Sequence, residues 1–163
     1  MSAFGNLSAR DLRLELEALY ADYIGCIDEG NLDRWPDFFT DHCVYKIIPR
    51  DNHRRGLPLA TWLCESRGML KDRVVTIRQT QLHAPRYLRH LVSGIRFGEW
   101  RNGVLGVRAN YVVVETLIDD VTRIFNAGQY VDEIVEEGDR LKFKQKLCVF
   151  DSIVVPNSLI YPI

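Results

Sequence analysis

Six side chains in this sequence are of the types that exchange protons in apolar pockets. Burial moves the pKa values of carboxylates and imidazoles toward neutrality, so either group beside a tyrosine can transfer a proton. The alternative is ordinary packing, because a tyrosine on the apolar face of a helix commonly has its hydroxyl bonded to a neighbour. Residue type leaves both interpretations open for Tyr20, Tyr23, Tyr45, His90, Glu115 and Asp132.

The spacing of the other reactive residues matches no catalytic or metal-binding motif. His42, His53, His83 and His90 form neither H-x-x-x-H nor H-x-x-E-H, and the two Cys–His pairs of a Rieske iron–sulfur cluster are absent. The sequence also lacks G-x-S-x-G, the P-loop and G-x-G-x-x-G. We therefore expect no metal ligands here, and neither a nucleophile-elbow hydrolase nor a dinucleotide fold.

Composition predicts an ordinary soluble protein with a single domain over residues 1–163. Its hydrophobic fraction is 47%, its charged fraction is 26% and its net charge is −1, which disfavours a nucleic-acid partner. No apolar run approaches the roughly 20 residues that span a bilayer, and Met1–Arg10 lacks the features of a signal peptide. The four cysteines form no C-x-x-C pair, so we expect reduced, mostly buried thiols in a cytoplasmic protein.

The elements that would position these side chains are clearest in the second half of the chain. Asn102-Gly103 is a favoured pair for a two-residue hairpin turn, because both positions need a positive φ. Short connections of this kind join consecutive strands into an antiparallel meander. The predicted strands are Arg89–Gly98, Val104–Leu117, Arg123–Val135 and Leu141–Phe150.

The last strand has the most regular alternation. A period of two places its lysines on one face and its apolar side chains on the other. We expect Lys142, Lys144 and Lys146 to lie in water, and the opposite face to need a cover from the N-terminal half.

The N-terminal half predicts helices that supply this cover. Ser8-x-x-Asp11 resembles a capping box, and apolar residues then recur every three or four positions as far as Ile27. Gly30 stops this helix, a short helix follows over Asn31–Phe39, and Cys43–Pro49 reads as a strand.

The middle of the chain is less clear. Arg50–Gly56 is predicted to be a polar, basic loop, and a third helix is predicted from Pro58 to Ile77. Its β-branched Val74–Ile77 also fits a strand, and His83–Tyr87 reads as a loop. The order of elements predicts an α+β fold in which a curved antiparallel sheet wraps the N-terminal helices into a cone, a shape that often encloses a cavity.

Two further features indicate contacts with other chains. The segments Ile153–Pro156 and Leu159–Ile163 are almost without charge, and an apolar end left in water would be sticky. They either fold back on their own domain or lie in a subunit interface, and we favour the interface. Arg67, Arg73 and Arg78 fit either a solvated helix face or a polar interface network.

Taken together, several stretches in this order and spacing resemble the small (beta) subunit of aromatic-ring-hydroxylating Rieske oxygenases. The resemblance covers nearly the whole chain. The matching stretches are Asp28 through Thr40, Cys43 through Tyr45, Asn52 through Leu59, Asp72-Arg73, Tyr87 through Leu91, Gly128 through Tyr130, and Cys148 through Ser152.

The resemblance implies the cone-shaped, cystatin-like fold of nuclear transport factor 2 and ketosteroid isomerase. It implies no catalytic, cofactor-binding or metal-binding residue in this chain. A large (alpha) subunit would carry a Rieske [2Fe-2S] cluster and mononuclear Fe(II), and three small subunits would support three large ones in an alpha3beta3 hexamer through beta–beta trimer contacts. A reductase, in some members with a ferredoxin, would bring electrons from NAD(P)H. The likeness is tightest to oxygenases of aromatic acids, with salicylate hydroxylases first and terephthalate and anthranilate enzymes beside them.

Two other functions stay open. The cone could be a stand-alone isomerase or dehydratase that works in its own cavity, or a dimeric binding module without catalysis. Binding to a large partner subunit would distinguish the oxygenase small subunit from both of these alternatives.

Overall fold

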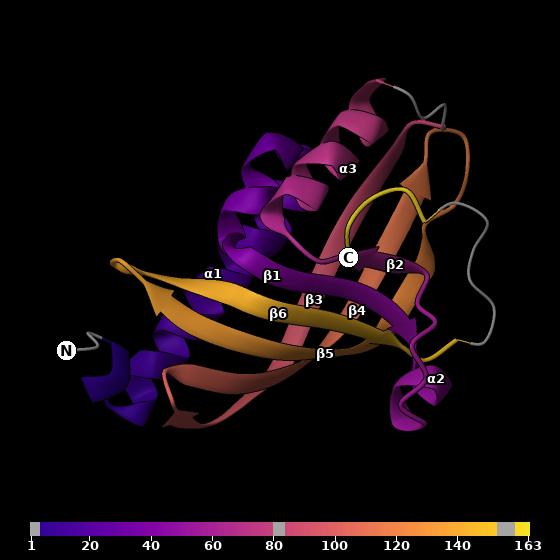
Figure 1. The fold of residues 1–163 in the computed structure, drawn as a ribbon. Helices are drawn as coiled ribbons and strands as arrows, with labels where there is room; N and C mark the ends of the chain where they lie inside the picture. The colour runs from indigo at the N-terminus through magenta and orange to yellow at the C-terminus, as the bar shows by residue number, and fades with distance from the viewer. Residues whose placement is uncertain (1–3, 80–83, 153–158) are drawn as a thin grey trace.

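A curved six-stranded sheet packs against the long helix α1 (Ala9–Asp28) in the computed structural model of the chain (Figure 1). The structure describes residues 4–79, 84–152 and 159–163. The strands lie in the order β2-β1-β6-β5-β4-β3, and all neighbours are antiparallel except the parallel pair β1 and β6. Their bounds are β1 Phe39–Pro49, β2 Trp62–Cys64, β3 Arg86–Arg101, β4 Val104–Leu117, β5 Arg123–Glu137 and β6 Arg140–Phe150.

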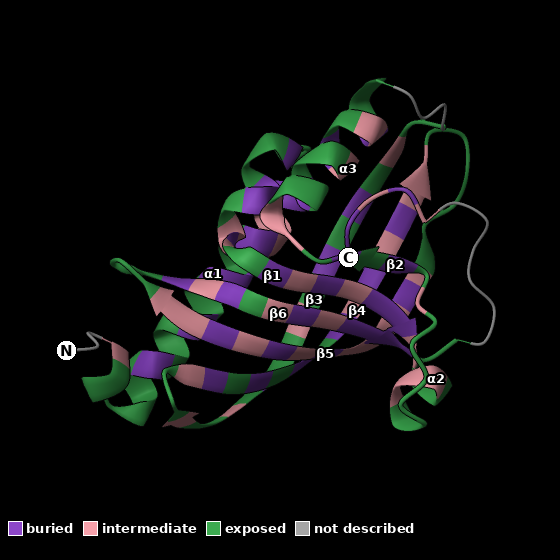
Figure 2. Cartoon of the chain, viewed as in Figure 1, coloured by how far each residue is buried: buried purple, intermediate pink, exposed green. Residues whose placement is uncertain are grey.

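The antiparallel meander β3-β4-β5-β6 is confirmed. Asn102 and Gly103 make the tight β3–β4 turn with φ values of 51° and 75°, as the Asn-Gly pair predicted. Figure 2 shows buried residues alternating with half-buried and exposed ones along the strands, which is the pattern of a sheet with one face on a core. The α+β fold with a curved sheet over N-terminal helices is therefore confirmed.

The first helix is also as predicted. The Ser8 hydroxyl accepts a hydrogen bond from the main-chain N–H of Asp11 at 3.1 Å, which satisfies one of the free donors at the start of α1. Its apolar face lies in the core and consists of Leu12, Leu16, Leu19, Tyr20, Tyr23, Cys26 and Ile27.

Three predictions for the next segment need correction. The short helix is the 3-10 helix η2 (Leu32–Phe38), and β1 begins directly after it at Phe39 instead of Cys43. The predicted loop Arg50–Gly56 contains the short helix α2 (Arg50–Arg54), closed by a hydrogen bond from the Arg55 N–H to the Asp51 carbonyl at 3.0 Å. Local polarity hid this helix, because its few residues bury no side chain of their own.

The predicted third helix starts too early. Trp62–Cys64 is strand β2, which pairs with β1, and the helix α3 runs only from Arg67 to Gln79. The Ser66 hydroxyl accepts the Met69 N–H at 3.2 Å and so marks the true start. The strand forms because Trp62 and Cys64 place their side chains in the core on alternate positions. The helical interpretation of Val74–Ile77 is confirmed.

The alternation of inward and outward side chains along β6 changes at a point within the strand. Glu133 pairs with Gln145 and Ile134 pairs with Phe143, so Lys144 is an extra residue in a β-bulge. The bulge shifts the pattern by one position, so that Phe143 and Lys146 both point inward. The prediction that Lys146 lies in water is therefore wrong, because its side chain is fully buried.

Candidate functional site

The buried lysine forms the centre of a polar cluster inside the cone. Its ammonium group lies 3.0 Å from a carboxylate oxygen of Asp132, and the Tyr20 hydroxyl donates to the same oxygen at 2.5 Å. The three residues come from β6, β5 and α1, so the cluster joins the helix to the sheet. All three side chains belong to the buried interior.

Aromatic rings surround the Lys146 ammonium group. Its nitrogen lies 3.4 Å from the centre of the Tyr130 ring, with the rings of Tyr20, Tyr23 and Phe143 also within cation–π distance. Such rings stabilise a cation that has lost its water. Burial raises the pKa of Asp132, and the positive charge of Lys146 opposes this rise.

The cluster resembles an acid–base site in its chemistry but is closed to solvent. Burial, followed by the charge of Asp132, raises the pKa of the Tyr20 hydroxyl well above its usual range. Two hollows on the described part of the protein, of about 400 and about 410 Å³, are lined by other residues. The second Asp132 oxygen and the Tyr130 hydroxyl have no hydrogen-bond partner among the described residues.

The segment Leu159–Ile163 packs beside this cluster, with Ile160 and Ile163 buried. Ile163 is 1% exposed, and its main-chain N–H donates to the Tyr45 hydroxyl at 2.8 Å. Its main-chain oxygen accepts hydrogen bonds from the Tyr23 hydroxyl at 2.9 Å and from the Cys148 thiol at 3.3 Å. The segment thus folds back on its own domain, and the interface expected for Leu159–Ile163 is wrong. The other half of that prediction, Ile153–Pro156, lies outside the described residues.

The tyrosines that hold this segment have a structural explanation. The hydroxyls of Tyr23 and Tyr45 are both engaged with Ile163, and Trp35 donates its indole N–H to the Tyr23 hydroxyl at 3.3 Å. Burial raises the pKa of both hydroxyls well above the usual range, which keeps them protonated as donors. This arrangement matches the packing interpretation of these two tyrosines.

His90 lies in a separate polar pair. Its Nδ1 is 2.5 Å from one oxygen of Asp28, and its main-chain N–H donates to the other oxygen at 2.9 Å. The Asp28 carboxylate therefore fixes the start of β3 against the end of α1. The Nε2 atom of His90 is buried without a hydrogen-bond partner among the described residues.

Glu115 lies in a third place, with two arginines. It accepts from Arg86 at 2.8 Å and from Arg123 at 2.9 Å, and its side chain is almost fully buried. The predicted proton-transfer residues are therefore not one site. Tyr20 bonds to Asp132, Tyr23 and Tyr45 meet at Ile163, and Glu115 and His90 each lie apart with partners outside this set.

The arginines predicted on the third helix also find partners within the chain. Arg67 forms an ion pair with Asp41, Arg78 pairs with Asp33 at 2.9 Å, and the Arg73 guanidinium lies 4.3 Å from the centre of the Trp62 ring. These contacts tie α3 to β1, η2 and β2. An interface network of these arginines stays a prediction.

The residues that the structure describes offer little for a metal ion. Within residues 4–79, 84–152 and 159–163, no three His, Cys, Asp or Glu side chains come together as a possible ligand group. His83 lies outside the described residues.

All four cysteines are buried free thiols, and burial raises the pKa of Cys148 to about 12. None of the described helices combines the length and the apolar character that a membrane span needs.

Sequence reasoning missed Lys146 and Asp28 as members of these clusters. Strict alternation along β6 places Lys146 in solvent, and the bulge at Lys144 reverses that placement. A signal was present, since Lys146 is followed by the apolar run Leu147–Phe150, which does not alternate with polar residues. Asp28 carried no signal, because its partner His90 is distant in sequence.

Comparisons with known proteins agree on one family. A family model described as "Ring hydroxylating beta subunit" matches residues 25–157. The anthranilate 1,2-dioxygenase small subunit of Burkholderia cepacia is 36% identical over 149 residues, which cover 91% of this chain and 92% of that protein. The terephthalate 1,2-dioxygenase terminal oxygenase component subunit beta 1 of a Comamonas species is 25% identical, with 92% and 97% covered.

Solved structures give the same result. The beta subunit of a proposed aromatic-ring-hydroxylating dioxygenase from Novosphingobium aromaticivorans superposes with a TM-score of 0.84 and 34% identity, over 94% of this chain and 97% of that one. A naphthalene 1,2-dioxygenase chain, 16% identical, shares the fold with a TM-score of 0.76 over 96% and 88%. This chain therefore belongs to the family of ring-hydroxylating beta subunits.

Proposed function

We propose that this chain is the structural small subunit of a multicomponent Rieske oxygenase that hydroxylates an aromatic acid. The observation that carries the proposal is the filled interior of the cone. Ile163 and the Lys146–Asp132 pair are buried between α1 and the sheet, where a cone-shaped enzyme would need space for a substrate. Family membership supplies the partner, a large oxygenase subunit.

In this proposal the chain positions the large subunits relative to one another and contributes no catalytic residue. Three small subunits hold three large subunits in an alpha3beta3 hexamer in the cytoplasm, so that the Rieske cluster of one large subunit reaches the mononuclear iron of its neighbour. Small displacements between reacting centres are costly, so a rigid base has a direct effect on rate. The reductase, with or without a ferredoxin, delivers electrons from NAD(P)H to the large subunit.

The substrate is an aromatic carboxylic acid in this proposal. The relatives are named for anthranilate and terephthalate, which both carry a carboxylate on an aromatic ring. Salicylate is our first choice for this chain, and the assay compares all three acids. Substrate contacts would lie in the large subunit.

Co-expression with the cognate large subunit tests the proposal. We expect the two chains to co-purify, and the assembled oxygenase with its reductase to consume NAD(P)H and hydroxylate one of the three acids. The purified small subunit alone should bind no iron and convert none of them. Stoichiometric iron on the isolated chain, or turnover by it alone, would contradict the proposal.

One observation favours the stand-alone isomerase or dehydratase as a second candidate. The 2.5 Å hydrogen bond between Tyr20 and Asp132 joins the two residue types that such chemistry uses. In that case the isolated chain would show the activity, and Tyr20→Phe, Tyr45→Phe or His90→Ala would remove it. A dimeric chain without activity and without a large partner would instead indicate a binding module.

A further inference from the structure

The outer face of the sheet, opposite the core, carries a strip of exposed and half-buried apolar side chains. Strand alternation explains it, because Tyr111 and Val113 point into the core and their neighbours Val112 and Val114 point outward. We call this set the apolar strip: Leu91, Val112, Val114 and Ile124.

The members of the apolar strip are neighbours across three strands. Leu91 of β3 pairs with Val112 of β4, and Val114 of β4 pairs with Ile124 of β5. Leu91 is 56% exposed and Ile124 is 71% exposed. A contiguous apolar surface of this kind marks a contact with another molecule, since single exposed apolar residues are ordinary and a cluster on one face is not.

A basic groove lies on the same face. It has a volume of about 410 Å³ and runs between α2 and the strands β4, β5 and β6. Among the described residues that line it are three arginines, Arg50, Arg54 and Arg108, together with His53, and one carboxylate, Asp151, which pairs with Arg50. Among the described residues, no carboxylate forms an ion pair with Arg54 or Arg108. We call this hollow the basic groove.

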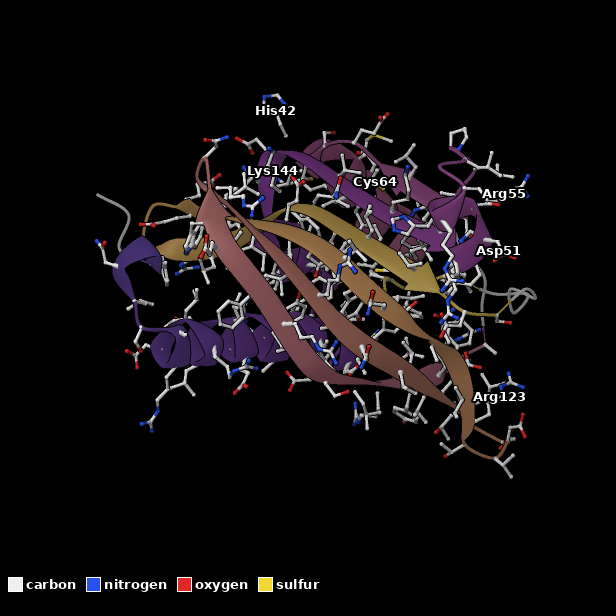
Figure 3. The ribbon with its side chains drawn as sticks, turned by 90° about the horizontal axis from the view of Figure 1, so that it is seen from below. His42, Asp51, Arg55, Cys64, Arg123 and Lys144 are labelled. Carbon is white, nitrogen blue, oxygen red and sulfur yellow. The ribbon has the colours of Figure 1, made fainter. Side chains whose placement is uncertain are left out.

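The apolar strip and the basic groove form one surface. Val112 pairs with Ala127, and two residues further along the same strands Asn110 pairs with Gln129, which lines the groove. Figure 3 shows Asp51 of α2 and Arg55, which follows α2, toward the same end of the sheet as Arg123, where β5 starts. A single partner can therefore contact both.

The chemistry of this surface selects its partner. A second copy placed face to face about a two-fold axis would set Arg54 and Arg108 against their own copies, which like charges disfavour. The phosphates of a nucleic acid could pair with the arginines of the groove, but the nucleic acid would not cover the apolar strip. A protein segment with carboxylates next to aliphatic or aromatic side chains complements both parts.

We propose that the basic groove and the apolar strip bind the large oxygenase subunit through a segment that combines carboxylates with apolar side chains. This inference rests on the proposed function, because that function supplies the large subunit. It deepens that function by assigning the contact to the outer face of the sheet, around β4 and β5.

Two double variants test the assignment in the co-expressed complex, and two single variants serve as their controls. Arg54→Glu with Arg108→Glu reverses the charge of the groove, and Leu91→Asp with Ile124→Asp places charges in the strip. The matched controls are Arg140→Glu, an exposed arginine at the β5–β6 turn, and Leu14→Asp, a leucine that is 55% exposed on α1. All four are compared with the wild type by circular dichroism and thermal unfolding.

We expect each test variant to weaken co-elution with the large subunit at least about tenfold and each control to leave it unchanged. Raising the salt concentration should weaken the wild-type complex and have less effect on the charge-reversed one. If both test variants fold normally and bind the large subunit as tightly as the wild type does, the assignment is overturned. If the test variants no longer self-associate but still bind the large subunit, the assignment is also overturned, because this surface would then bind a second copy of the chain. A wild-type chain that never binds a large subunit would refute the proposed function itself.

Discussion

The ammonium group of Lys146 lies 3.0 Å from the carboxylate of Asp132, and solvent reaches neither side chain. Taking both charges out of water is costly, and a pair of this kind is retained only when its partners are well placed. The aromatic rings around Lys146 and the hydroxyl of Tyr20 supply that placement. The pair therefore holds α1 to β5 and β6 at the centre of the cone.

Removing one partner of this pair should destabilise the protein strongly. Lys146→Met leaves the Asp132 carboxylate buried without its cation, and we expect the free energy of unfolding to fall by about 3–5 kcal/mol in urea titrations. Lys144→Met is the matched control, because Lys144 is half exposed on the same strand, and its effect should stay within about 0.5 kcal/mol. If Lys146→Met with Asp132→Asn were no more stable than Lys146→Met, the unpaired carboxylate would not be the cause.

The same variant should respond to pH with a defined sign. Burial raises the pKa of Asp132 in the folded protein above its value in the unfolded chain, and Lys146 opposes that rise. A group with a raised pKa binds more protons when folded, so its contribution to stability is greatest in acid and declines as the pH rises above its ordinary pKa. We expect the deficit of Lys146→Met relative to wild type to be smaller at about pH 4.5 than at about pH 8. A deficit that grows in acid would contradict this assignment.

The hydroxyl of Tyr45 should matter for stability. It exchanges hydrogen bonds with both the main-chain N–H and the main-chain oxygen of Ile163. Tyr45→Phe leaves the N–H without that partner inside the core, so we expect a loss of about 1–3 kcal/mol in urea titrations. Tyr87→Phe, on the exposed outer face, should be neutral. Unchanged stability together with loss of an activity of the isolated chain would support the isomerase alternative.

Gly128 should tolerate no side chain. A Cβ there would collide with the main-chain oxygen of Val149 and lie 2.8 Å from the Phe150 Cα, and neither backbone atom can move freely within β6. We expect Gly128→Ala to lose about 1–3 kcal/mol or more in thermal or urea unfolding. Gly106→Ala is the control on the neighbouring strand, because its Cβ would meet nothing within 4 Å. Equal effects of the two variants would argue against the close approach of β5 and β6.

The thiols should react slowly in the folded protein. Burial raises the pKa of Cys148 to about 12 and the pKa values of Cys26 and Cys43 to about 11. At about pH 8 only about one Cys148 side chain in ten thousand would be a thiolate, and the thiolate is the reactive form. We expect a colorimetric disulfide reagent to modify all four cysteines rapidly in urea and these three very slowly in native buffer. Rapid native modification of Cys148 would show that Leu159–Ile163 leaves the core.

The antiparallel meander and the first helix were predictable because their signals are local. Asn102-Gly103 specifies its turn through the φ values of two adjacent residues, and Ser8 caps α1 through a bond to a residue three positions later. Membership in the beta-subunit family was equally accessible, since it rests on short stretches spread along the whole chain.

The contents of the cone were not predictable in the same way. The pairs His90–Asp28 and Tyr45–Ile163 join residues far apart in sequence, and the parallel pairing of β1 with β6 joins the two halves of the chain. Strict alternation could not place Lys146, because a single bulge at Lys144 changes the face of the later residues of β6, and the run Leu147–Phe150 signals only that alternation ends there.

The sequence by itself determined the meander of β3 to β6, the helix α1 and the family, because turns, caps and periodicity act over a few residues. It did not determine α2, β2 or the start of α3. Only the tertiary structure decided that Leu159–Ile163 lies inside the cone and that Lys146 is buried beside Asp132. The physical reason is that a buried position is defined by distant elements closing around it, and no window along the chain contains them.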